Sequence, residues 1–376
     1  MVIKPYIILI FEISFNFYVS KNFPFDLFSY ISNSNWDKNT NVIISPILVS
    51  KTLLFLSNAS VGKTQKEIIQ TLRFNSVLEG NTYINKITEF FNLNKFLKFS
   101  NAICSRISLK HNFISLAKKF DFEYKDIYDK DDLISWIGRN TEYKFKEIFN
   151  NEDPKSFDFI LISSLLFNGN LLSKFTLCND HSNIYFYDLI GKRRKIQMLE
   201  SKGNFNYYED EKLKVIEIPF EENSMSTLIF IPSSKYNLQT LIDELNDEYY
   251  DIILKKMEKK NIELYIPKLK IEYKTQLANF LKQIGIKKAF RIDAEFPSIT
   301  LNYGLHLTDF FHQASLEIKE SFFQFATFIG LIDLNNKDYI QYKRINVNKP
   351  FLLFIKSNNF PKDFILMAKI TKLGKK

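Results

Sequence analysis

Few residues in this chain have the types and spacing that catalysis requires. Gly62-Lys63-Thr64 resembles the end of a phosphate-binding loop, but the first glycine of such a loop is replaced by Ser57. The sequence contains no Gly-x-Ser-x-Gly, His-Glu-x-x-His or Cys-x-x-Cys motif. The histidines lack the spacing of metal ligands and are His111, His181, His306 and His312. We therefore expect no enzymatic activity, no metal and no other cofactor.

The remaining reactive side chains are predicted to be structural. His312 precedes Gln313 and Ala314 in a strand-like segment, so we interpret it as a hydrogen-bonded structural histidine. Cys104 and Cys178 are too few for a disulfide framework. Both have apolar or strand-like surroundings, which predicts buried free thiols.

Length and composition predict one large domain over residues 21–376. The chain of 376 residues has 10 Gly, 10 Pro and no linker-like stretch, and its 38 Phe supply material for a core. The net charge of +9 favours anionic partners. However, Lys192-Arg193-Arg194-Lys195 and Lys255-Lys256 are typical of solvated turns or helix faces. No interleaving of basic and aromatic residues indicates a nucleic acid partner.

Residues 1–20 have two interpretations. Lys4 precedes an apolar stretch from Tyr6 to Phe11, which resembles a signal peptide and would imply secretion to the extracellular space. Glu12 interrupts that stretch, and Tyr18-Val19-Ser20 is a poor cleavage site. The alternative is an extension of the first helix in a cytoplasmic protein. No other segment has the apolar length of a membrane span, so no membrane partner is expected.

Hydrophobic periodicity predicts a mixed fold. Thr64-Gln65-Lys66-Glu67 is a capping-box sequence that would open one helix, and Thr275 would open another that ends at Gly285. Asp131–Asn140 is predicted to be a third helix. The predicted strands include an apolar hairpin and three further segments, which are Lys214–Phe220 with Ser226–Pro232, Ile160–Phe167, Ile262–Ile266 and Phe351–Ile355.

A long run from Glu320 to Lys349 lies between two strand-like segments, Leu305–Lys319 and Pro350–Lys356. Such a connection inside a compact domain usually carries function. Its first half is apolar on both alternating faces, which is unusual for a solvated loop. We therefore expect part of Phe322–Leu334 to pack as strand against or within the main sheet; the rival expectation is an exposed partner-binding site.

Segments that follow one another over residues 21–372 resemble the serpin family. The principal ones are Asn41–Pro46, Thr64–Phe74, Asp132–Thr141, Leu161–Gly169, Lys195–Met198, Val215–Phe220, Ile262–Lys270, Leu281–Phe290, His312–Glu320 and Asn348–Phe354. The resemblance implies an α+β fold of three mainly antiparallel β-sheets, eight to nine helices and a long reactive-centre loop at about residues 320–349. It also implies a monomer that inhibits a serine protease, or a cysteine protease, without being an enzyme.

In inhibitory serpins a protease cleaves this loop, and the freed loop inserts into the main sheet as a new strand. The resemblance implies a hinge of small residues, which this chain lacks. The hinge is Glu320, Ser321, Phe322, Phe323, Gln324, Phe325, Ala326, Thr327 and Phe328. Overpacking costs about 1–3 kcal/mol per site, so slow insertion and doubtful covalent trapping are expected. No Pro lies between Ser321 and Lys349 to forbid a strand.

Two counts disagree on the bait bond. Counting forward from Glu320 gives Asn336–Lys337, and counting back from Pro350 gives Tyr339–Ile340. The candidates are Asn336, Lys337, Asp338, Tyr339 and Ile340. By resemblance, Lys337 would suit trypsin-like proteases and Tyr339 chymotrypsin-like ones.

The resemblance also marks a sheet-opening region at Ser45, Leu48, Ser163 and His312. Leu48 stands where the family usually has Ser, and Ser163 stands where it usually has Asn. His312 would partner that Asn, so we expect the hydrogen-bond cluster to be rebuilt around Ser163.

Two functions remain open from the sequence. One is a protease inhibitor, and the alternative is a non-inhibitory binding or decoy protein, which the bulky hinge favours. By analogy with some serpins, Lys86, Lys95 and Lys98 would give weak polyanion binding. The sequon Asn58-Ala59-Ser60 is expected to be packed between helices.

Overall fold

The computed structural model describes residues 23–34, 39–94, 97–126, 130–140, 159–167, 171–178, 185–221, 224–301, 303–319 and 341–373. Both interpretations of residues 1–20 lie outside these ranges. The hinge and all bait-bond candidates also lie outside them. The α-helices of the described part are α1 Phe23–Ser34, α2 Pro46–Ala59, α3 Gly62–Thr71, α4 Val77–Leu93, α5 His111–Lys119, α6 Lys130–Asn140, α7 Leu238–Glu244, α8 Asp247–Lys255 and α9 Ala278–Gln283.

The described strands form three sheets, most of whose strand pairs are antiparallel. The strands are β1 Val42–Ile44, β2 Leu97–Ser105, β3 Phe122–Asp126, β4 Phe159–Phe167, β5 Thr176–Leu177, β6 Tyr185–Tyr187, β7 Arg193–Lys195, β8 Met198–Glu209, β9 Leu213–Pro219, β10 Met225–Pro232, β11 Glu258–Pro267, β12 Leu269–Gln276, β13 Asp309–Ile318, β14 Lys343–Asn346, β15 Phe351–Ser357 and β16 Phe364–Ile370. The predicted α+β fold of eight to nine helices and three mainly antiparallel sheets is therefore confirmed for the described part of the chain.

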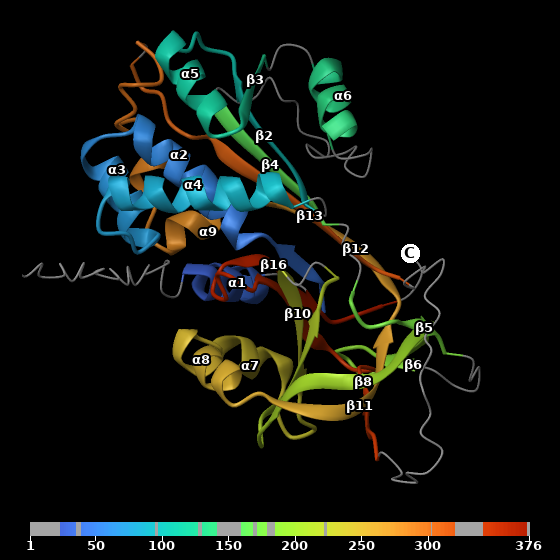
Figure 1. Cartoon of the computed structure of the whole chain (residues 1–376). Coiled ribbons are helices and arrows are strands. Elements are labelled where there is room, and N and C mark those ends of the chain that lie inside the picture. The colour runs from blue at the N-terminus through green and yellow to red at the C-terminus, as the bar shows by residue number, and fades with distance from the viewer. Residues whose placement is uncertain are drawn as a thin grey trace, which may run out of the picture.

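The main sheet has five strands in the order β12-β13-β4-β2-β3. Its strands cross the upper half of Figure 1, where α2 lies on one side of them and α6 on the other. β4 and β13 are parallel neighbours although they are far apart in the sequence. Parallel pairing of this kind needs both faces covered, and the described side chains of β4 are accordingly buried on both faces.

The second sheet has nine strands, with β1-β16-β15-β10-β9-β8-β11-β14 in order and β5 paired to β8. The predicted hairpin of β9 and β10 is confirmed by their antiparallel register. An aromatic core fills the space between β10, β15 and β16 on one side and α1 and α8 on the other. Its members are Phe25, Phe28, Phe230, Tyr250, Phe354 and Phe364. β6 and β7 form a separate two-stranded hairpin.

The capping box predicted at Thr64–Glu67 was wrong. α3 begins at Gly62, whose φ of +57° suits glycine, and Val61 provides no side-chain cap. The Glu295 carboxylate instead accepts a hydrogen bond from the Thr64 backbone N–H at 3.0 Å. Glu67 accepts from the backbone N–H groups of Lys287 and Lys288 at 2.8 and 2.6 Å. Both carboxylates therefore join α3 to the segment that follows α9.

Thr275 does not open a helix, because it lies in β12 opposite His312. α9 begins at Ala278 and ends at Gln283, and Gly285 follows with a φ of +126°.

The thiols of Cys104 and Cys178 were both predicted to be buried and free. Cys104 is buried and Cys178 is half-buried, and both are free.

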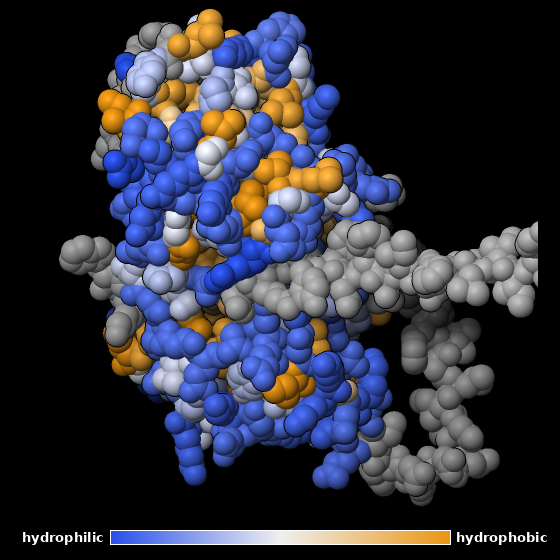
Figure 2. All heavy atoms as spheres, turned by 90° about the vertical axis from the view of Figure 1, so that its left-hand side faces the viewer, coloured by the Kyte–Doolittle hydropathy of each residue, from blue (hydrophilic) through white to orange (hydrophobic). Residues whose placement is uncertain are grey.

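The face that carries α3 and α8 is mostly hydrophilic, with separate hydrophobic patches (Figure 2). This pattern is ordinary for the surface of a globular protein. Among the described helices, none combines the length and apolarity needed to cross a membrane.

Candidate functional site

The segment 320–340 connects two different sheets. It follows β13 of the main sheet, and it precedes β14, which lies at the edge of the second sheet and pairs in parallel with β11. The predicted connection from Glu320 to Lys349 therefore includes a strand near its end, Lys343–Asn346. The hydrophobic pattern does not mark this strand, because its residues are mostly charged or polar, as is common at sheet edges.

Several side-chain and backbone contacts hold the short strand β14 in place. Ile345 is buried, and the Val347 backbone N–H donates to the Tyr265 carbonyl oxygen at 2.8 Å. The Arg344 guanidinium lies 4.6 Å from the centre of the Tyr265 ring, and Lys343 forms an ion pair with Glu209. These contacts fix the point at which the chain re-enters the fold after residue 340.

The other side of the site is the β4–β13 seam, which we define as the direct pairing of Asp309–Ser315 with residues 160–166. Over this length β13 pairs with β4 and with β12, so no further strand lies between β4 and β13. Phe322–Leu334, of which part is expected to pack as strand against or within the main sheet, lies outside the described residues. The direct pairing of β4 with β13 leaves no place for a strand between them along the seam.

A buried polar cluster lies beneath the seam. The Ser45 backbone N–H donates to His312 Nε2 at 3.0 Å. Ser163 Oγ lies 2.9 Å from Thr52 Oγ1 and 2.9 Å from Asn101 Oδ1. Ser163 is thus the centre of one hydrogen-bonded group, whereas His312, its neighbour in the sheet register, bonds to α2's N-cap residue instead. The serine side chain is too short to take the place of an asparagine beside His312.

Burial controls the chemistry of this cluster. It lowers the pKa of His312 to about 3, so the imidazole stays neutral. Because Nε2 accepts from the Ser45 N–H, the ring proton is on Nδ1. Among the described residues, His312 Nδ1 and Ser45 Oγ have no hydrogen-bond partner. Leu48 is fully buried and fills the space where a smaller serine would leave room. The cluster can hold α2 against the sheet, but it has no group suited to acid–base catalysis near neutral pH.

Thr52 and Asn101 were not predicted to belong to this cluster. A signal was present for Thr52, because Ser45, Leu48 and Thr52 recur at three- and four-residue spacing and therefore share one face of α2. Asn101 lies within an alternating strand, where nothing marks it as a partner of Ser163.

The other predicted positions do not gather into a site. The Asn58 amide of the sequon lies inside α2's packing, where it donates to the Leu54 carbonyl and to Asn81 Oδ1. Lys86 is half-buried on α4, and the side chains of Lys95 and Lys98 lie outside the described residues. Within the described ranges, His, Cys, Asp and Glu form no group that could hold a metal ion.

Comparison with known proteins gives one consistent result. The family model described as "Serpin (serine protease inhibitor)" matches residues 18–372. Human Serpin B4 is 24% identical over 89% of this chain and 94% of its own length. Antitrypsin of Bombyx mori is 24% identical over 88% of this chain and 88% of its own length.

Solved structures agree on the fold. Native protease nexin-1 with heparin superposes with a TM-score of 0.82 at 22% identity, covering 94% of this chain and 98% of the other. Human thyroxine-binding globulin with its ligand gives a TM-score of 0.81 at 19% identity, covering 95% and 98%. At these identities the structural likeness establishes the fold alone.

Proposed function

This chain belongs to the serpin family of serine protease inhibitors, and we propose that it presents residues 336–340 as bait to a serine protease. The observation that carries the proposal is the placement of the two loop anchors. β13 is one strand of the β4–β13 seam, and β14 belongs to the other sheet. The chain therefore leaves the main sheet next to the seam and re-enters the fold at the second sheet, as a bait loop requires.

The topology also allows insertion after cleavage. A chain that turns back from the end of β13 would run antiparallel to β13 and, because β4 is parallel to β13, antiparallel to β4 as well. Such a strand would satisfy backbone groups on both neighbours. Lys337 favours a trypsin-like target, and Tyr339 favours a chymotrypsin-like one.

We further propose that cleavage exceeds covalent trapping. Every second hinge residue would enter the space beneath the seam, where Leu48, Thr52 and Ser163 are fully buried. Adding phenylalanine rings to a packed site costs about 1–3 kcal/mol each. The protease is then released by hydrolysis of the acyl-enzyme before the loop has inserted.

The alternative is a binding protein that keeps the fold and has lost the trap. The bulky hinge favours this alternative too. Human thyroxine-binding globulin, which has a similar fold, was solved in complex with a bound ligand. Replacing the hinge phenylalanines distinguishes a slow protease trap from a binding protein that has no trap.

The experiment mixes the full chain with trypsin, chymotrypsin and elastase and follows SDS-stable bands and intact masses. We expect a cut within residues 336–340 and little covalent complex. A variant with Phe322, Phe323, Phe325 and Phe328 changed to Ala should raise the covalent fraction. The matched control, Ile332→Ala/Leu334→Ala, shortens apolar side chains beyond the hinge and should not.

Two results would oppose the proposal. Cuts only outside residues 336–340 would reject this segment as bait. A four-alanine hinge that is cut without any covalent band would reject the trap and favour the binding protein.

A further inference from the structure

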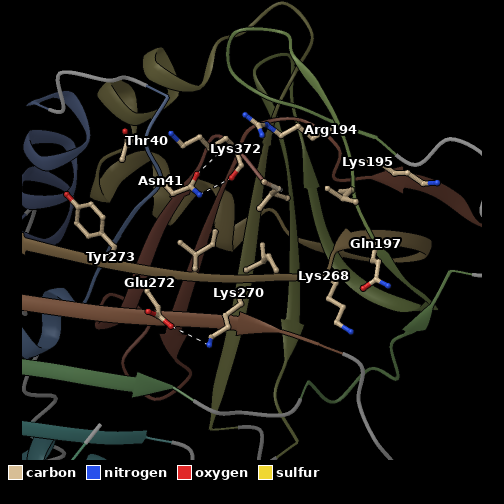
Figure 3. Close-up of a pocket in the computed structure, with 14 residues that line it drawn as sticks. Thr40, Asn41, Arg194, Lys195, Gln197, Lys268, Lys270, Glu272, Tyr273 and Lys372 are labelled. Atoms are coloured by element: carbon tan, nitrogen blue, oxygen red, sulfur yellow. Dashed lines mark hydrogen bonds and ion pairs between the residues drawn. The ribbon is translucent and has the colours of Figure 1, made fainter. Parts of the chain in front are cut away.

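Helix α2 packs against one face of the main sheet, and its start is fixed to the second sheet. β1, which leads into α2, pairs in antiparallel register with β16. The Asn41 side chain lines the cleft drawn in Figure 3, where it donates to the Lys372 carbonyl oxygen at 2.9 Å. It also accepts from the Thr371 N–H at 2.8 Å. These contacts hold the chain in place immediately before α2.

A row of polar residues crosses the main sheet next to α2. Asn101 of β2, Ser163 of β4 and His312 of β13 are neighbours in the sheet register. The β4–β13 seam runs between Ser163 and His312, and each of these two residues bonds to α2 or to its N-cap residue. Both sides of the seam are therefore attached to the same helix. The seam cannot open unless one attachment breaks or α2 itself moves.

The attachment on the β4 side is charged and shielded from water. The Lys51 ammonium of α2, whose side chain is 1% exposed, donates to the Asp121 carboxylate at 2.8 Å. Asp121 immediately precedes β3, and its carbonyl oxygen accepts from the Asn101 amide at 3.4 Å. Burial lowers the pKa of Lys51, and the Asp121 carboxylate opposes this shift. A charge-assisted hydrogen bond of this kind is stronger than a neutral one.

Two further contacts of α2 lie on the same side of the seam. Thr52 Oγ1 lies 2.9 Å from Ser163 Oγ, which donates to Asn101 Oδ1 at 2.9 Å. The Phe55 ring stacks on Phe122 of β3 with 4.5 Å between the ring centres. These contacts join α2 to β3 and β4 directly and to β2 through Ser163.

The attachment on the β13 side is weaker. Within the described residues, its polar contact with α2 is the neutral hydrogen bond from the Ser45 N–H to His312 Nε2 at 3.0 Å. A neutral hydrogen bond contributes less than one to a charged group. If the seam opens, the bond between Ser45 and His312 is therefore the one that should break first.

We propose that Lys51 and Asp121 form a latch that keeps β3, β2 and β4 on α2, so that the seam opens by movement of β13 away from Ser45. Lys51 is then a positioning residue, because it determines which side of the seam moves. The inference concerns the fold alone, and it stands whether or not residues 336–340 are protease bait.

The test is hydrogen exchange of the full chain, read at single amides. In the unmodified chain the Ser45 amide should exchange together with the amides that join β4 to β13, because one movement exposes both. Lys51→Met keeps a long apolar side chain and removes the charge, which releases β4 as a second moving part. The seam amides should then exchange about tenfold faster, while the Ser45 amide changes much less because His312 can stay bonded to it.

The matched control is Lys356→Met, which removes another buried lysine, paired with Glu217 at 2.9 Å in the second sheet. It should speed exchange in β9 and β15 and leave the seam unchanged. A milder variant, Asp121→Asn, keeps an acceptor for Lys51 and suits the φ of +59° at this position. It should move the same seam amides by a smaller factor.

Three results would overturn the latch. The first is unchanged seam exchange in both Lys51→Met and Asp121→Asn. The second is equal acceleration of the seam, the Ser45 amide and β15 with β16 in Lys51→Met, which would mean a general loss of stability. The third is faster seam exchange in the control variant to the same extent as in Lys51→Met.

Discussion

The β4–β13 seam and the aromatic core of the second sheet are both largely buried in the described part of the chain, but they are held together differently. The seam joins two parallel strands over a polar cluster that leaves His312 Nδ1 and Ser45 Oγ without partners among the described residues. In the aromatic core, Phe354 contacts Phe28, Phe230 and Phe364 at ring separations of 5.4, 4.8 and 5.4 Å. Its strands are antiparallel.

The difference indicates which part of the molecule can rearrange. Apolar burial is not directional and is lost in proportion to the area exposed, so the aromatic core resists opening. The seam combines buried apolar residues of β4 and β13 with a polar cluster, whose hydrogen bonds each contribute only about 0.5–1.5 kcal/mol. We infer that the seam is the weaker region and that the aromatic core is the frame around it.

The largest effect is expected in the aromatic core. Phe354→Ala removes a ring that packs against four others and should lower the free energy of unfolding by about 3–5 kcal/mol. Phe354→Leu, the conservative control, should cost much less. Chemical denaturation measures both. A loss below about 1 kcal/mol for Phe354→Ala would mean that this core is not the frame.

A second effect of similar size should depend on pH. Burial raises the pKa of Asp363 to about 7, although the Tyr83 hydroxyl donates to its carboxyl at 3.0 Å. Its folded-state pKa lies above the unfolded value, so the native state keeps a proton that the unfolded chain loses. Stability should therefore fall as pH rises from about 4 to 7, by on the order of 4 kcal/mol.

Asp363→Asn keeps an acceptor for Tyr83 and should flatten this pH dependence. Thermal melting of both proteins between pH 4 and 8 is the measurement. An unchanged slope in the variant would show that another group is responsible.

The seam should respond more weakly. His312→Ala removes the acceptor of the buried Ser45 N–H and should cost about 1–3 kcal/mol. Ser45→Ala removes a hydroxyl that has no partner among the described residues, so it should be nearly neutral. Equal losses in the two variants would contradict the hydrogen-bond arrangement found beneath the seam.

The smallest effect is expected at Ser163. Ser163→Ala takes a hydrogen-bond partner from Thr52 and Asn101 and should cost about 1 kcal/mol. Its neighbour Ser164 makes a long bond of 3.4 Å to the Ser100 carbonyl oxygen, so Ser164→Ala serves as the control and should cost less. Denaturant midpoints compare the two. A larger loss of stability in Ser164→Ala than in Ser163→Ala would contradict the hydrogen-bonding role assigned to Ser163.

Hydrophobic periodicity predicted the large elements well, because apolar strands such as Phe351–Ile355 and the β9–β10 hairpin are fixed by burial. It failed where the partner comes from a distant segment. The Glu295 carboxylate caps α3 across the chain, and no local pattern at Thr64 shows this. Lys51 lies in an apolar helix, yet it is buried and pairs with Asp121 at 2.8 Å.

Thermal melting before and after loop cleavage tests the central claim, which is that the bulky hinge keeps the seam closed. The seam is already paired along Asp309–Ser315, so an unchanged melting temperature cannot reflect prior insertion there. We predict that cleavage within residues 336–340 leaves the melting temperature nearly unchanged, while the four-alanine hinge variant gains stability on cleavage. A rise of tens of degrees in the unmodified chain would show that the loop inserts readily and would contradict the account.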